Sequence, residues 1–353
     1  MPSWSEISAE IGKVQAAGDP AAPDTVRRRY LAQLAAYTQR DTILYASRFI
    51  QPGMHISDVE SIIDEDVQAL IEVLIGLKSR KLDIILHSPG GSAEATESIV
   101  KLLRARYLDI RVIVPQVAMS AATMWACAAD RIVMGPQSSL GPIDPQMRIR
   151  GEGGAADLVP AQAILDQFER AKDECLNRSS LPAWIPILRQ YAPALLVQCE
   201  NAQALSEELV KKWLRTYMLA RTKYAARDSR RIARGLSDHG KFKSHARHID
   251  RDWARGVGGG SVGLRVDNLE KDPKLEGLVM SVFHAAMIVF SNVPLVAKIV
   301  ENQNGRAFVK IAGAAQIVGR PPGALPPPGL PSPPPGPGST PAPVPVPTGL
   351  SHP

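Results

Sequence analysis

The stretch LDIILHSPGGSAEATESIVKLLRAR, residues 82–106, gives the clearest indication of the fold class of this 353-residue chain. Its first six residues form a short apolar run, which is typical of a buried strand, and the run breaks at SPGG. From Ser92, a residue type that commonly caps helices, the apolar residues recur with helical spacing. The stretch therefore predicts a strand, a glycine turn and a helix in direct succession.

The same alternation continues on both sides of this unit. A helical pattern over 57–80 begins with Ser57 as a predicted N-cap and has Glu60 three residues later. Further helices are predicted over 25–38, 92–106 and 120–129, and strands over 41–49, 82–87, 110–115 and 131–135. Apolar strands that alternate with helices indicate βαβ crossovers, so we expect an α/β fold with a mainly parallel sheet covered on both faces.

The rest of the chain divides by composition. We expect an N-terminal extension over 1–24 and a main domain over 25–273, which runs through a long helical stretch to a short strand in VGLRVDNL. A helical C-terminal segment is predicted over 274–319. Residues 320–353 hold 15 of the 30 prolines and almost no charge. Such a composition predicts an extended, disordered tail, whose PxxP runs suit an SH3-like or WW-like partner domain.

Charge and cysteine content limit the classes of function. The net charge is +6, and residues 211–255 hold 14 Lys or Arg against four Asp or Glu. Aromatic residues are sparse in this region and no recognition motif occurs, so we expect a solvated helical face and no nucleic-acid binding. Three cysteines without a CxxC pair argue against a disulfide framework and a structural zinc site, and neither a metal nor a cofactor is expected.

The chain is expected to be soluble and cytoplasmic. Its first twenty residues lack the apolar core of a signal peptide. The most apolar segment, LVMSVFHAAMIVF at 278–290, is short for a bilayer span and contains His284. We therefore predict a buried or interface helix there and no membrane span.

Two features follow neighbouring strands at the edge where open α/β sheets build their sites. In HSPGG, Gly90 and Gly91 can direct backbone N–H groups into a cavity, which suits an oxyanion formed during acyl transfer. In VAMSAATMWACAAD, residues 117–130, Ser120 stands at the start of a helix and the N–H of Ala121 faces the same space. From the residues alone, Ser120 is either a helix cap or a nucleophile activated by a neighbouring base.

The order and spacing of SPGG, AMSAA and VGLRVDNL resemble those of Clp-fold serine peptidases. The resemblance is strongest to the serine dehydrogenase proteinase family, which is similar to the Clp protease subunit and to signal peptide peptidase A. It covers about residues 40–310 and implies a crotonase-like layered fold, which we assign to the domain over 25–273, with Ser120 as nucleophile. It also implies an oxyanion hole formed by the N–H groups of Gly91 and Ala121, a turn shaped by Gly90, and assembly into a homo-oligomer.

The general base is where the chain departs from the Clp protease pattern. No histidine occurs between His87 and His239, and Asp144 stands where a histidine is expected. Signal peptide peptidase A and its relatives use a lysine as base, and the leading candidate here is Lys172, beside an apolar helical stripe. Lys211 and Lys212 are the reserve lysines. Three further alternatives stay open, in which Asp144 is catalytic or only a turn residue, His245 and His248 fold back over the cleft and supply the base, and His87 lines the site.

The leading hypothesis is an ATP-independent serine endopeptidase that cleaves a peptide or protein substrate through Ser120 and an acyl-enzyme, with a Ser-Lys type of base. One alternative is a crotonase-like enzyme that acts on acyl-CoA thioesters, with Asp144 or a glutamate as catalytic acid. Another is an inactive oligomeric scaffold that recruits partners through its proline tail. Reaction with an active-site-directed serine probe distinguishes the first hypothesis from the scaffold.

Overall fold

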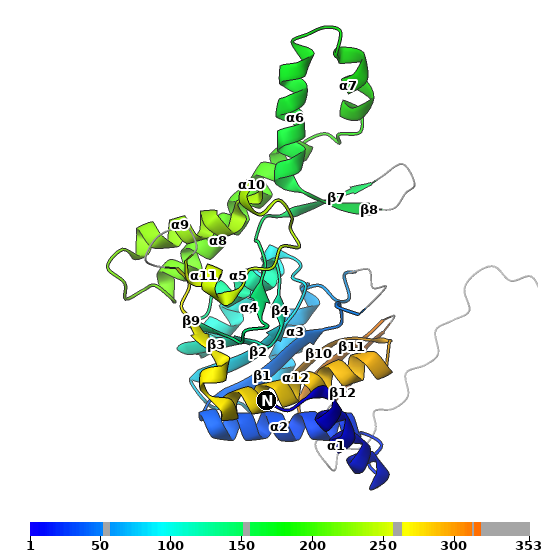
Figure 1. The fold of residues 1–353 in the computed structure, drawn as a ribbon, viewed down its shortest axis with the longest axis vertical. Helices are drawn as coiled ribbons and strands as arrows, with labels where there is room; N and C mark the ends of the chain where they lie inside the picture. Colours follow the sequence, from blue (N-terminus) through cyan, green and yellow to red (C-terminus); the bar gives the residue numbers. More distant parts are fainter. Residues whose placement is uncertain (52–56, 151–155, 257–262, 313, 319–353) are drawn as a thin grey trace, which may run out of the picture. The chain divides into compact units, whose positions relative to one another are not determined.

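The computed structural model describes residues 1–51, 57–150, 156–256, 263–312 and 314–318, and its centre is an eight-stranded sheet with the order β12-β11-β10-β1-β2-β3-β5-β9 (Figure 1). The parallel part of the sheet consists of β1 (Asp41–Ser47), β2 (Lys81–His87), β3 (Asp109–Val114), β5 (Arg131–Met134) and β9 (Val266–Asn268). The predicted α/β class and mainly parallel sheet are confirmed.

Helices cover both faces of this sheet, as predicted. On one face, α2 (Ala22–Thr38) and α12 (Pro273–Asn292) pack against apolar residues of the strands, such as Leu44 and Ile85. The N-terminal helix α1 (Trp4–Ala16) packs on these two helices. The other face is covered by α3 (Glu65–Leu74), α4 (Ala93–Arg106), α5 (Ala121–Cys127) and α8 (Leu195–Thr216).

By length and composition, an 18-residue window of helix α12 is apolar enough to cross a membrane. However, 67% of that window is buried inside the protein, against α2 and the sheet. The helix therefore has the environment of a core helix, and the buried helix expected over 278–290 is present.

The C-terminal part of the sheet differs from the prediction of a helical segment over 274–319. After α12 the chain forms three antiparallel strands, β10 (Val296–Asn302), β11 (Ala307–Ile311) and β12 (Ala314–Val318), and β10 pairs with β1. Strand β10 buries Lys298, Glu301 and Asn302. These polar residues interrupt the apolar pattern by which a buried strand is identified. The proline-rich segment predicted to be disordered lies outside the described residues.

A second difference concerns the helix predicted over 57–80, because α3 begins only at Glu65. Ser57 and Glu60 do interact, since Glu60 accepts hydrogen bonds from the N–H and the hydroxyl of Ser57 at 3.0 and 2.6 Å. The prediction of Ser57 as an N-cap is nevertheless wrong, because the residue at the N-cap position of α3 is Asp64. The helix does not begin at Ser57, since Ile62 instead pairs with the backbone at Gly91. A long-range pairing thus replaces the local helical preference.

The described residues also form two short sheets, and the chain from α6 to α11 is mainly helical. Strand β4 (Val117–Ala118) pairs with β6 (Ser139–Leu140), and β7 (Gln146–Arg150) pairs with β8 (Ala156–Pro160). Helices α6 (Ala161–Cys175) and α7 (Leu181–Leu188) follow β8; α6 shares a small apolar core with α8, and α7 contacts α6. The other helices among the described residues are α9 (Ala225–Ser237), α10 (His239–Phe242), α11 (Arg251–Arg255) and the 3-10 turn Leu269–Lys271.

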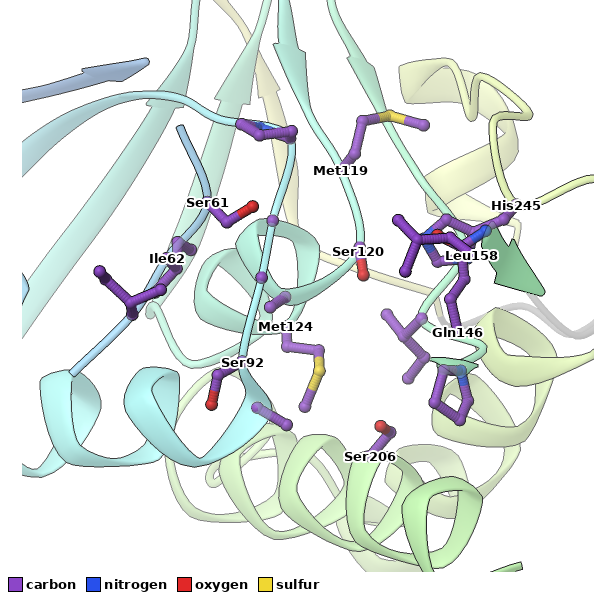
Figure 2. A pocket seen from close by; sticks show the side chains of 18 of the residues that line it. Ser61, Ile62, Ser92, Met119, Ser120, Met124, Gln146, Leu158, Ser206 and His245 are labelled. Atoms are coloured by element: carbon purple, nitrogen blue, oxygen red, sulfur yellow. The ribbon is translucent and has the colours of Figure 1, made fainter. Parts of the chain in front are cut away.

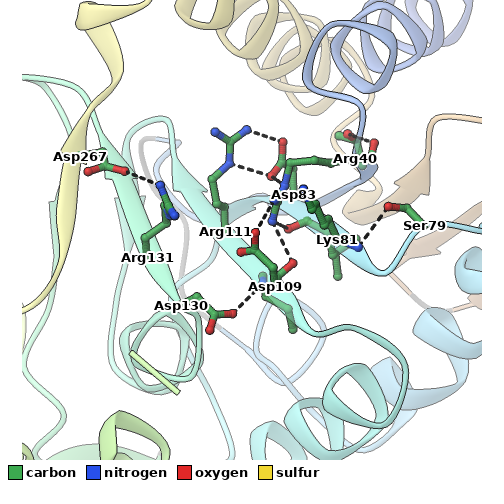
Figure 3. Close-up of polar contacts among 12 residues, drawn as sticks. Arg40, Ser79, Lys81, Asp83, Asp109, Arg111, Asp130, Arg131 and Asp267 are labelled. Atoms are coloured by element: carbon green, nitrogen blue, oxygen red, sulfur yellow. Dashed lines mark hydrogen bonds and ion pairs between the residues drawn. The ribbon is translucent and has the colours of Figure 1, made fainter. Parts of the chain in front are cut away.

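Ion pairs fix the register of the parallel strands at their amino ends (Figure 3). Asp83 on β2 is fully buried and contacts two guanidinium groups, those of Arg40 at 2.6 Å and of Arg111 at 2.8 and 2.6 Å. Arg40 also binds Asp109 on β3, at 2.8 Å, and it holds the pKa of that carboxyl below its usual value. The opposite ends of the strands carry the glycine turn and Ser120.

Candidate active site

Ser120 lies between β4 and α5 in a backbone conformation that side chains rarely adopt. Its φ is 51° and its ψ is −121°, and its side chain does not cap the helix that follows. A non-glycine residue in such a region costs about 1–3 kcal/mol and is found mostly at functional sites. The helix-cap alternative for Ser120 is therefore not supported, and the hydroxyl is left available for another role.

The Ser120 side chain points into a cavity of about 690 Å³ (Figure 2). Figure 2 shows Ser61, Ile62 and Ser92 on one side of it and Gln146, Leu158 and His245 on the other. Much of the lining is apolar and includes Phe49, Ile62, Met119, Met124, Ile143 and Leu158. A cavity with an apolar lining and a few converging polar groups is typical of a ligand or substrate site.

The glycine turn runs directly beside Ser120. Gly90 has a φ of 98°, and a Cβ there would lie 2.7 Å from the Ser120 Cβ and 2.6 Å from the Met119 carbonyl oxygen. Gly91 has a φ of 149°, and a Cβ there would lie 2.3 Å from the carbonyl oxygen of Ile62. Both positions require glycine, since a side chain would collide with backbone atoms.

The N–H groups of Gly91 and Ala121 are free to bind an anion. Ile62 bonds to both neighbours of Gly91, because its N–H donates to the Gly90 carbonyl at 2.7 Å and its carbonyl accepts from Ser92 at 2.9 Å. Neither Gly91 nor Ala121 donates its N–H to an acceptor among the described residues. Both residues line the cavity, where such donors suit an oxyanion.

Asp144 contacts two histidines. Its side chain is 1% exposed, and its two oxygens lie 2.9 Å from His239 Nδ1 and 2.8 Å from His245 Nδ1. Because a carboxylate only accepts hydrogen bonds, each ring donates from Nδ1, which leaves Nε2 of a neutral ring as an acceptor. His245 also lines the Ser120 cavity. The structure therefore brings three of the predicted residues, Ser120, Asp144 and His245, to one site.

A chain of backbone pairings aligns these residues. Ser88, just before the glycines, bridges Ala118, and β4 pairs with β6. Leu140 of β6 then exchanges two hydrogen bonds of 2.9 Å with Ile249. His248, next to Ile249, lies 2.6 Å from the Ser139 hydroxyl. The loop that contains His245 is thus fastened to the strand that precedes Asp144.

Lys172 is not brought to this site. Its side chain is 56% exposed on α6, and its ammonium group lies 2.8 Å from Glu169, which raises the pKa of Lys172. Within the described part of the chain, the cavity lining does not include Lys172. The Ser-Lys pairing stays a prediction that no contact among the described residues supports.

His87 is fully buried at the end of β2, away from the cavity lining. Its ring centroid lies 4.7 Å from that of Phe49 and 5.0 Å from that of Phe283. Burial lowers its pKa to about 3. This is the environment of a neutral core histidine, next to the glycine turn but behind it.

Two parts of the site are not predicted from the sequence. The first is the contact of His239 with Asp144, which no sequence pattern indicates. The second is the pairing of Ile62 with the glycine turn, because the helical spacing of the sequence predicts a helix at Ile62. The only local signal for His239 is that it follows Asp238, a helix-capping residue type, which gives no indication of the carboxylate it contacts. Among the described residues, no group of three or more His, Cys, Asp or Glu can hold a metal ion.

Comparison with known proteins gives one family. Residues 47–181 match the family described as ClpP-like SDH-type serine proteinase, which confirms the resemblance predicted from SPGG and AMSAA. Two uncharacterized proteins of Methanocaldococcus jannaschii are similar in sequence. MJ0137 is 39% identical over 99 residues, or 28% of this chain and 34% of that protein. MJ1495 is 33% identical over 114 residues, which are 32% of this chain and 37% of that protein. The matches thus span about a third of these relatives' length.

Two solved structures of the 1510-N membrane-bound stomatin-specific protease are also similar. One is a serine-to-alanine mutant and the other a lysine-to-alanine mutant in complex with a substrate peptide. Each is 16% identical and matches 59% of this chain with a TM-score of 0.35, and the matches cover 74% and 70% of the two solved chains.

Proposed function

We propose that this chain, whose residues 47–181 match the ClpP-like SDH-type serine proteinase family, cleaves peptide bonds through Ser120 without a nucleotide cofactor. The observation that carries the proposal is the combination of a strained, uncapped Ser120 with two free N–H groups and an Asp144–His245 pair around one cavity. These are the parts that acyl transfer requires, namely a nucleophile, an oriented base and an oxyanion hole.

In the proposed first step, His245 Nε2 takes the proton of the Ser120 hydroxyl while Oγ bonds to the substrate carbonyl carbon. The carbonyl oxygen becomes an oxyanion that accepts hydrogen bonds from the N–H groups of Gly91 and Ala121. Asp144 holds the His245 ring through Nδ1 and stabilises its protonated form. His245 then donates the proton to the leaving amine as the C–N bond breaks, which leaves an acyl-enzyme.

Water then hydrolyses the acyl-enzyme, with His245 acting again first as base and then as acid. His245 removes a proton from the water that attacks the acyl carbon, and the same N–H groups bind the second oxyanion. When the ester bond breaks, the proton passes from His245 to Ser120 Oγ and the carboxylate product leaves. The enzyme thereby returns to its starting state.

The base is assigned by comparing two groups in the same chain. His245 lines the cavity and its Nδ1 is bonded to a buried carboxylate, whereas Lys172 is exposed and its pKa is raised by Glu169. A lysine acts as base only when its pKa is lowered. The contacts therefore favour His245 over the Ser-Lys arrangement expected from the sequence.

The test is peptide cleavage by four single variants, each of which is first checked to be folded like the unaltered chain. We expect Ser120→Ala to abolish cleavage and His245→Asn to lower kcat/KM by about 100- to 10,000-fold, the usual contribution of a general base. Lys172→Met and Lys212→Met serve as controls, because both lysines are exposed and neither belongs to the cavity lining among the described residues, and we expect rates close to that of the unaltered chain. Unchanged cleavage by Ser120→Ala would refute the proposed function. Loss of cleavage in Lys172→Met together with normal cleavage in His245→Asn would refute only the assignment of His245 as the base.

A further inference from the structure

A buried lysine lies outside the chemistry described so far. The Lys298 side chain on β10 is 0% exposed, and its ammonium group lies 2.7 Å from both oxygens of Asp66. It also donates to the carbonyl oxygen of Ser61 at 2.8 Å. An ion pair in such a position contributes little net stability, because the cost of desolvating two charges offsets their attraction. The role of Lys298 is therefore better inferred from the groups that it contacts than from its contribution to stability.

The pair fixes the backbone on both sides of Ile62. Lys298 binds the carbonyl of Ser61, the residue before it, and Asp66 accepts from the N–H of Ile63, the residue after it, at 2.9 Å. The Tyr45 hydroxyl donates to the same carboxylate at 2.9 Å. Ser61, Ile62 and Ile63 therefore form a short segment held by buried, charge-assisted hydrogen bonds.

This segment, residues 61–63, in turn orients the glycine turn. Ile62 bonds to the Gly90 carbonyl and to the Ser92 N–H, at 2.7 and 2.9 Å. In this parallel pairing the N–H of the intervening Gly91 does not bond to Ile62, and it has no acceptor among the described residues. The pairing that holds the neighbours of Gly91 thus leaves its N–H available for an oxyanion.

Lys298 does not have the properties of a general base. Each of its contacts is made by an N–H that already has an acceptor, so no nitrogen lone pair is available to take a proton. Within the described chain, it does not line the Ser120 cavity. Burial lowers the pKa of Lys298, but the neighbouring Asp66 opposes that shift and favours the charged form.

We propose that Lys298 and Asp66 are positioning residues for the oxyanion hole, which act through the 61–63 segment to orient the Gly91 N–H. This role rests on the proposed peptidase function. It requires no contact with substrate. It predicts that loss of the pair weakens binding of the tetrahedral state and leaves binding of the unreacted substrate nearly unchanged.

The test uses the double variant Lys298→Met/Asp66→Asn, because Lys298→Met alone leaves a buried carboxylate without its cation. The introduced asparagine keeps an oxygen for Tyr45 and Ile63, but no ammonium group holds Ser61. We expect kcat to fall about 10- to 100-fold at nearly constant KM, less than the ~100- to 1,000-fold loss on deleting an oxyanion donor. Affinity for a peptide aldehyde, which bonds to Ser120 and fills the oxyanion hole, should fall by the same factor.

Glu301→Gln is the matched control. Glu301 lies on the same strand, is also 0% exposed, and pairs with Arg27 at 2.6 Å on the side away from the 61–63 segment. We expect this variant to lose stability but keep kcat and aldehyde affinity. Unchanged kcat and aldehyde affinity in the double variant would overturn the inference. It would also be overturned if Glu301→Gln lost kcat and aldehyde affinity to the same extent, with the losses in both variants proportional to their loss of thermal stability. Neither result touches the peptidase function, which fails only if Ser120→Ala cleaves as well as the unaltered chain.

Discussion

The pH dependence of folding tests the assignment of His87 as a core residue. Its ring is fully buried between Phe49 and Phe283, and burial lowers its pKa from 6.5 to about 3, against an opposing effect of the Val117 backbone. In the folded protein His87 is neutral across most of the acid range. In the unfolded chain the same ring takes up a proton below its ordinary pKa.

The sign of the effect follows from proton binding. Between these two pKa values the unfolded chain binds a proton that the folded protein does not. The free energy of unfolding therefore has its full value, as far as His87 is concerned, above pH 6.5, and it decreases as the pH falls toward 3. Each pKa unit corresponds to about 1.4 kcal/mol of unfolding free energy. At about pH 5 the loss is therefore roughly 2 kcal/mol, and it approaches about 5 kcal/mol near the folded pKa.

The assay is urea denaturation of the unaltered chain and His87→Leu, at about pH 7.5 and about pH 5. Leucine has a similar size, suits the aromatic surroundings and does not titrate. All other groups titrate equally in the two proteins, so they cancel when the two pH dependences are subtracted. We expect the unaltered chain to lose about 2 kcal/mol more than the variant over this interval. An equal pH dependence in both proteins would refute the assignment.

Three further substitutions test the geometry of the fold and the site. Ser120→Gly should raise the unfolding free energy by about 1 kcal/mol relative to Ser120→Ala, because only glycine relieves the positive φ, and thermal unfolding measures the difference. Gly90→Ala should abolish cleavage and lower stability, since its Cβ would lie 2.6 Å from the Met119 carbonyl oxygen; normal cleavage would contradict the close approach of the turn to Ser120. Asp83→Asn should cost about 3 kcal/mol in urea denaturation, because it leaves Arg111 without its carboxylate and Arg40 with Asp109 alone. Asp267→Asn, at an exposed pair, should cost under about 0.5 kcal/mol, and equal costs would exclude a special role for the buried pair.

Local signals in the sequence are sufficient for the framework of the site. SPGG after an apolar run predicts the turn, and Ser92 does cap α4 by accepting from the Ala95 N–H at 3.0 Å. These signals act within a few residues, so they do not depend on the rest of the fold. The position of Ser120 beside the glycines follows from two neighbouring parallel strands, which the alternation of elements already predicts.

The partners of Ser120 depend on contacts between distant segments, which the sequence does not reveal. His245 reaches the cavity through a loop that is fastened to β6, and loops have no periodic pattern. The apolar stripe predicted beside Lys172 consists of Ile164, Leu165, Phe168 and Ala171. Ile164 and Ala171 are buried and the other two are half-buried, but a stripe defines only the inward face of a helix. Lys172 lies on the outward face. Assembly into a homo-oligomer, binding of a partner by the proline tail, and a cytoplasmic location stay predictions.

The role of Ser120 as an activated nucleophile is tested most directly by fluorophosphonate labelling of the unaltered chain, with mass-spectrometric mapping of the modified residue. We expect one modification, at Ser120, which is absent in Ser120→Ala and slower in His245→Asn but not in Lys172→Met. An unlabelled chain, or a label on another residue, would contradict this role.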